Sequence, residues 1–138
     1  HRAAFHRQIL QTADLYRSKG ENEIAVIMAQ TACELVTESA FDVLFRAVGV
    51  SAKDQEQLRQ TTYNLGNKRT AAVYRLLAKD RVQGQPFWRD FKAHADLRHA
   101  IVHKGAKATA HDADRSVSAA TDFIAHIEAV IAAASASP

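Results

Sequence analysis

The residues from Leu97 to Gly105, which read LRHAIVHKG, carry side chains suited to phosphodiester chemistry. Four of the seven histidines in this chain of 138 residues lie between positions 94 and 111. Arg98 is a permanent cation whose planar donors match a phosphate, and a histidine such as His103 transfers protons near neutral pH. Together they can stabilise charge and exchange protons at a phosphodiester without a metal ion.

The segment around these residues is positively charged. Lys104 and Lys107 follow His103 closely, and no acidic residue stands between Asp96 and Asp112. The whole chain has a formal net charge of +3 and a pI near 9.2. Such a mild excess permits an anionic partner without requiring one.

A zinc site is the main competing interpretation of the histidines. His99 and His103 are four positions apart, a spacing that places two imidazoles on one face of a helix. A third ligand would have to come from His111, Asp112 or Asp114. The Glu that zincin helices carry between their two histidines is missing, and the single cysteine, Cys33, stands in an apolar stretch. We therefore predict no metal, no cofactor and an unreactive Cys33.

Few helix breakers interrupt the chain, which contains five glycines and two prolines. Apolar residues recur at helical spacing, and no convincing strand pattern is present. We predict an all-α fold, an antiparallel helical bundle of five to six helices with a long second helix. Residues 1–138 are expected to form a single domain with a flexible tail over 132–138. The predicted helices span residues 3–17, 21–48, 51–62, 69–79, 86 to 103 or 104, and 112–133. Ser51 is the expected N-cap of the third helix, and residues 63–67 are expected to form a loop. Glycines end three of these helices: Gly20 the first, Gly49 the second and Gly105 the fifth.

In the fifth predicted helix, one apolar stripe includes Trp88, Phe91, Ala95 and Val102. Arg98 falls inside this stripe, so its guanidinium should point toward the core and find an acceptor there. His94 and His111, each taken singly, are expected on solvated faces.

The second predicted helix offers acceptors for that guanidinium. Glu34, Glu38 and Asp42 follow one another at steps of four and lie within or beside its apolar sector. One interpretation is that they form salt bridges to arginines of neighbouring helices. The other is that Glu34 or Glu38 orients Arg98, and both can hold together.

The run from Arg98 to His103, followed by Gly105, resembles the Arg-x4-His motif of HEPN domains. The position after the arginine is usually polar in that family, and His99 fits. A helical bundle of this length agrees with the family, as do an inward acid in the segment QTACEL and a motif that stands before one final helix. Lys104 is a departure, because many members have glycine directly after the histidine.

The resemblance implies a metal-independent endoribonuclease, of the type found among toxins and antiviral effectors. In such enzymes the RNA 2′-OH attacks its own phosphodiester and leaves a 2′,3′-cyclic phosphate. The implied roles are acid–base catalysis for His103, charge stabilisation for Arg98, and orientation of Arg98 or contact with phosphate for His99. Lys104 and Lys107 are expected to bind RNA phosphates.

RNA and a second copy of the chain, in a symmetric homodimer, are the partners that this interpretation implies. An antitoxin or regulatory protein is a further candidate. We expect a cytoplasmic protein without membrane contact, because no signal-peptide pattern is evident and a single cysteine suits a reducing compartment. Two alternatives stay open: a non-catalytic HEPN-like module that binds RNA or protein, and a small helical adaptor in which the motif is coincidental.

Overall fold

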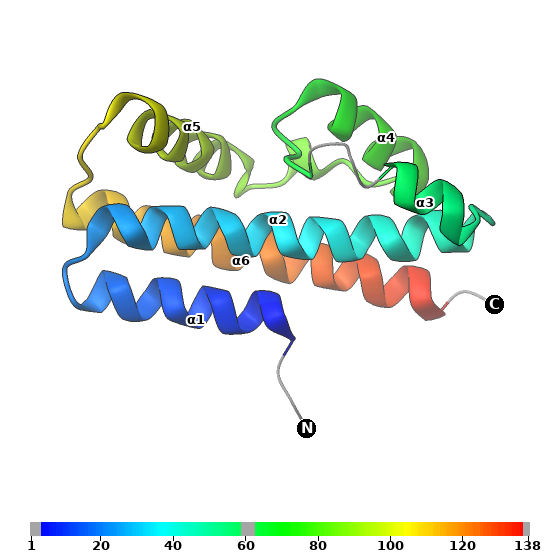
Figure 1. Cartoon of the computed structure of the whole chain (residues 1–138), viewed down its shortest axis with the longest axis horizontal. Helices are drawn as coiled ribbons and strands as arrows, with labels where there is room; N and C mark the ends of the chain where they lie inside the picture. Colours follow the sequence, from blue (N-terminus) through cyan, green and yellow to red (C-terminus); the bar gives the residue numbers. More distant parts are fainter. Residues whose placement is uncertain (1–3, 59–62, 137–138) are drawn as a thin grey trace.

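The computed structural model describes residues 4–58 and 63–136, and within these ranges it contains helices and no strand. The prediction of an all-α bundle is thereby confirmed (Figure 1). The elements are α1 (Phe5–Ser18), α2 (Asn22–Ala47), α3 (Ala52–Leu58), α4 (Lys68–Ala78), the short 3₁₀ turn η1 (Val82–Gly84), α5 (Trp88–Lys104) and α6 (Ala110–Ala136).

Local capping sets several of these helix ends. The Ser51 hydroxyl accepts a hydrogen bond from the Asp54 amide at 3.1 Å, which confirms Ser51 as the predicted N-cap of α3. Asn67, expected in a loop, is the N-cap of α4, because its Oδ1 accepts from the amides of Arg69 and Thr70 at 3.0 and 3.1 Å. The rest of the predicted third helix, residues 59–62, lies outside the described residues.

Three helices lie side by side along the length of the molecule, with α1 against α2 and α2 against α6 (Figure 1). α5 packs over one end of the α2–α6 pair, and α3 and α4 lie toward the other. α1 and α5 run opposite to α2, as an antiparallel bundle requires. α6 differs, because it runs in the same direction as α2 (Figure 1). The reason is that α5 returns the chain to the start of α2, where α6 then begins.

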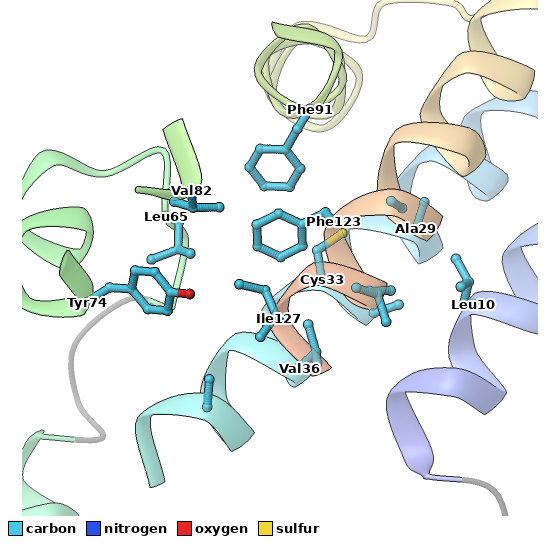
Figure 2. Close-up of a cluster of buried hydrophobic side chains, with 14 of the residues drawn as sticks. Leu10, Ala29, Cys33, Val36, Leu65, Tyr74, Val82, Phe91, Phe123 and Ile127 are labelled. Atoms are coloured by element: carbon cyan, nitrogen blue, oxygen red, sulfur yellow. The ribbon is translucent and has the colours of Figure 1, made fainter. Parts of the chain in front are cut away.

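Aromatic and aliphatic side chains from all the long helices meet in one core (Figure 2). Phe91 of α5 stacks on Phe123 of α6, with ring centroids 4.2 Å apart and planes 8° from parallel. Cys33 and Val36 of α2 lie beside this stack, and Leu10 of α1 closes the core from the far side (Figure 2). The stacking of Phe91 on Phe123 therefore fixes the beginning of α5 to the bundle.

Cys33 is a packing residue of this core, with 2% of its surface exposed. Burial, and secondarily the nearby charge of Glu34, raises the pKa of the thiol far above its usual range. The thiol is therefore protonated at neutral pH, in line with the predicted lack of reactivity.

α2 and α6 are long and apolar enough, by length and composition alone, to cross a membrane. The core helices of soluble proteins meet the same criterion. The most apolar stretch of α2 is 56% buried inside the bundle and that of α6 is 33% buried. The absence of membrane contact stays a prediction.

The last helix is longer than the sequence pattern predicted. α6 continues to Ala136, whereas we expected a flexible tail from residue 132. Two physical causes extend it. Alanine is the strongest helix former, and Val130, Ile131 and Ala134 pack against the core. Residues 137–138 lie outside the described part of the chain.

Candidate functional site

The Arg98–His103 motif occupies the last two turns of α5, and a glycine ends that helix. Gly105 adopts a left-handed conformation with φ of 66°, and the amide of Ala106 donates to the Ala100 carbonyl at 3.2 Å. This is the C-terminal stop predicted from the sequence, and it is a conformation that glycine adopts at little cost. His103 and Lys104 therefore lie in the final turn, beside the negative end of the helix dipole.

The loop that leaves the motif is tied to the start of α2. The Ala108 amide donates to Glu23 Oε2 at 3.2 Å, and Asn22 Nδ2 donates to the Ala108 carbonyl at 3.3 Å. Beneath these bonds, Val26, Ile101 and Ala108 form a small second core. The end of α5 is thus held in place by both polar and apolar contacts.

The two histidines of the motif lie together on the surface. Both side chains are exposed, and the centroids of their rings are 4.5 Å apart with planes tilted by 45°. The spacing of four residues brings them onto one face of α5, as predicted. Two adjacent exposed imidazoles can contact one anionic ligand and can exchange protons with it.

Arg98 is half-buried, and its Nε atom is fully buried without a hydrogen-bond partner. Among the described residues, no carboxylate comes within ion-pair distance of its guanidinium. The expectation that Arg98 would find an acceptor in the core is therefore wrong for Nε. Such an unpaired buried donor is costly in a folded protein.

The buried stripe of α5 is also rotated from the one we predicted. Phe91, His94 and Ile101 are the buried residues of this helix, whereas Val102 is 46% exposed. Val102 was expected inside, and His94 was expected on a solvated face. Both expectations are wrong, because α5 turns His94 rather than Val102 toward α2. His111 is exposed, as expected.

His94 lies at the centre of a polar contact between α5 and α2 that the sequence did not reveal. Its Nε2 is 3.0 Å from Oε1 of Gln30, and both side chains are buried. Gln30 in turn donates from Nε2 to Oε1 of Glu34 at 3.4 Å. Glu34 therefore connects to α5 through Gln30 and His94, without an ion pair to Arg98. Glu38 is half-buried and likewise forms no ion pair within the described ranges.

Burial lowers the pKa of His94 to about 4, and the positive charge of nearby Arg98 acts in the same direction. The imidazole is therefore neutral at physiological pH. Its second ring nitrogen, Nδ1, is buried without a hydrogen-bond partner. A signal for this residue existed in the sequence, since His94 stands one turn before Arg98 and one turn after Phe91 on the same helix.

The remaining candidate residues lie at the end of α5 and in the chain that follows it. Lys104 and Lys107 are exposed and follow His103 closely in the sequence, and exposed cations can contact a phosphate backbone. Asp112 is engaged in capping α6, because its Oδ2 accepts from the Thr109 amide at 2.9 Å. Within the described residues, no group of three or more His, Cys, Asp or Glu side chains is arranged to hold a metal ion.

Comparison of the chain with protein-family models, with curated proteins and with solved structures gave no match.

Proposed function

We propose that this protein is a metal-independent endoribonuclease of HEPN type, in which the end of α5 contacts the scissile phosphodiester. The observation that carries the proposal is the pair of exposed imidazoles of His99 and His103, 4.5 Å apart, beside an arginine in the sequence. RNA is the substrate that fits, because its 2′-OH supplies a nucleophile that DNA lacks.

The reaction assigns one task to each side chain. The His103 imidazole of one copy accepts the proton of the 2′-OH as O2′ bonds to phosphorus, and the bond from phosphorus to O5′ breaks. The His103 imidazole of a second copy donates a proton to the departing 5′ oxygen. The Arg98 guanidinium stabilises the extra negative charge on the phosphorane. Lys104 and Lys107 hold the neighbouring phosphates through charge alone.

A symmetric homodimer is part of the proposal. Five residues of an α-helix turn the chain so that Arg98 and His103 stand about 140° apart around the axis of α5. One copy therefore presents the two groups in different directions, and a twofold axis beside α5 supplies an arginine and a histidine from each copy to one phosphate. The exposed Val102 between the two histidines is an apolar contact for such an axis.

The second candidate is a non-catalytic module that binds RNA or protein. The observation that favours it is the separation of the two motif residues within one chain: Arg98 is half-buried against the bundle, while His103 is exposed. In this case the cationic end of α5 binds an anionic partner and no bond is broken.

The two candidates are separated by a cleavage assay on structured RNA in EDTA. Wild type, Arg98→Ala and His103→Ala are compared with the matched controls Arg89→Ala and His111→Ala, which remove the same side chains from exposed positions outside the motif. Cleavage by wild type and the controls, with a loss of at least about 100-fold in both motif variants, supports the nuclease.

Chemistry at the 2′-OH is tested by replacing the RNA with an oligonucleotide of the same sequence that carries 2′-O-methyl groups. The nuclease should bind this analogue without cleaving it, and its RNA products should carry a cyclic phosphate. Equal RNA binding by all variants without cleavage supports the second candidate. If RNA is neither bound nor cut, the motif is coincidental and the chain is a helical adaptor.

A further inference from the structure

Two unpaired polar atoms lie one helical turn apart inside the bundle. His94 Nδ1 and Arg98 Nε are both buried, and neither has a hydrogen-bond partner. His94 and Arg98 are four residues apart on α5, a spacing that places two side chains on the same face of a helix. They are also near enough for the charge of Arg98 to act on the imidazole.

The contact to Gln30 decides which nitrogen of His94 carries the proton. The Glu34 carboxylate accepts from the amide nitrogen of Gln30, so the amide oxygen of Gln30 faces His94. An amide oxygen can only accept, so Nε2 of His94 carries the hydrogen and donates it. Nδ1 then carries no hydrogen, and its lone pair can only accept a hydrogen bond. Arg98 Nε–H is a donor with no acceptor.

The two atoms are therefore complementary. We propose that His94 is a positioning residue for Arg98: its Nδ1 accepts the Nε–H of the guanidinium when the two terminal nitrogens of Arg98 engage an RNA phosphate. The proposal rests on the proposed function only in assigning phosphate binding to Arg98. Glu34 and Gln30 then act together to keep the proton of His94 on Nε2, so that Nδ1 can accept the hydrogen bond from Arg98.

This arrangement explains why a buried histidine faces a buried glutamine at the motif. A guanidinium has five donors in a fixed plane, and an acceptor at Nε fixes the direction in which the other two nitrogens point. Because a pair of parallel hydrogen bonds to phosphate depends on that direction, His94 determines how well Arg98 meets the phosphate. His94 touches neither RNA nor the reacting atoms.

The first test is nuclear magnetic resonance on the isotope-labelled protein, with inorganic phosphate as the probe. We expect His94 to carry its proton on Nε2. On saturation with phosphate, the Nδ1 resonance should move toward the value of a hydrogen-bonded nitrogen, and exchange of the Arg98 Nε–H with water should slow by about tenfold. An unchanged Nδ1 resonance while phosphate shifts the Arg98 signals would overturn the proposal.

The second test compares two substitutions of one residue. His94→Asn keeps an acceptor near the position of Nδ1, whereas His94→Gln keeps a polar group near that of Nε2 and loses the acceptor. We expect His94→Asn to retain RNA cleavage within about threefold and His94→Gln to lower kcat by about tenfold or more, with a smaller change in KM. His111→Asn, at an exposed histidine, serves as the matched control.

A third variant guards against misfolding at the buried site. Glu34→Gln keeps the shape of a half-buried side chain and removes the charge that orients Gln30. It should shift part of the His94 population to the form protonated on Nδ1, and lower cleavage in proportion.

For the two substitutions of His94, equal cleavage by His94→Asn and His94→Gln would overturn the positioning role.

The resonance readout also separates the two proposals. If wild type fails to cut RNA but phosphate still couples Arg98 to His94 Nδ1, the nuclease is wrong and the positioning role stands. If RNA is cut and that coupling is missing, the positioning role alone is wrong.

Discussion

The stacked rings of Phe91 and Phe123 hold the helix that carries the motif against the longest helix of the bundle. Both side chains are almost completely buried. The ring of Phe91 also approaches that of His94, with centroids 6.1 Å apart. The position of the polar contact at Gln30 therefore depends on this aromatic pair.

Phe91→Ala should lower the free energy of unfolding by about 3–5 kcal/mol, because it removes a buried ring and leaves a cavity. Urea denaturation followed by circular dichroism measures the change. Phe5→Ala is the matched control, since Phe5 is 62% exposed and its loss should cost less than about 0.5 kcal/mol. Equal losses in the two variants would mean that the ring pair does not hold α5 in place.

The pH dependence of stability should report the buried imidazole. The pKa of His94 is lowered to about 4 in the folded protein, from an ordinary value of 6.5. The unfolded chain therefore binds a proton at a higher pH than the folded one. The contribution of the neutral His94 to the free energy of unfolding is fully present above pH 6.5. It is lost as the pH drops toward 4, which lowers the free energy of unfolding by up to about 3 kcal/mol.

The measurement is a series of denaturant titrations between pH 7.5 and 4, a window assigned to His94 by its pKa values. His94→Gln removes the titrating group, so its stability should vary much less over this window. A slope as steep in this variant as in wild type would assign the pH dependence to other groups. Glu128 contributes at lower pH, because Arg7 and then His6 lower the pKa of its carboxyl by hydrogen bonding.

Much of the framework was predictable from local signals. Glycines at positions 20, 49 and 105 have positive φ and end three helices where the sequence placed those ends. Ser51 caps α3 through its own hydroxyl, and the histidines at 99 and 103 share a face because their spacing dictates it. Each of these features depends on residues within one or two turns of the chain.

The face of α5 that packs against the neighbouring helices could not be predicted in this way. Periodicity defines a stripe on the helix, but the choice between Val102 and His94 as the buried residue depends on what the facing helix presents. Gln30 of α2 supplies a hydrogen-bond partner for an imidazole. That partner lies 64 positions away in the sequence, and no local pattern pairs the two residues. The unpaired state of Arg98 Nε follows from the same packing.

Gly105→Ala should destabilise the protein by about 1 kcal/mol, because alanine at a φ of 66° is strained even where no atom obstructs its Cβ. Gly105→Asn should cost less, since asparagine tolerates this conformation. Thermal denaturation gives the comparison. Gly84→Ala is the control, because φ at Gly84 is not positive and a Cβ there meets only an ordinary contact. A neutral Gly105→Ala would show that the end of α5 relaxes freely.

Val102→Asp should abolish self-association if the twofold axis lies beside α5, because it places a charge in an apolar interface. Sedimentation velocity measures the state of assembly. Leu76→Asp provides the control, since Leu76 is 77% exposed on α4, away from the motif. A wild-type chain that stays monomeric at high concentration contradicts the dimer, and so does a dimer that survives Val102→Asp but not Leu76→Asp.

The hydrogen bonds from Asn22 and Glu23 to the backbone of Ala108 join two segments that are far apart in the sequence, the start of α2 and the connection between α5 and α6. A substitution in the first turn of α2 alters the segment by which the chain leaves α5, without changing any residue of the Arg98–His103 motif. In a random library screened for loss of the proposed RNA cleavage, inactivating changes should gather at position 23 as well as in the motif. Second-site revertants of those changes should then arise in the connection between α5 and α6.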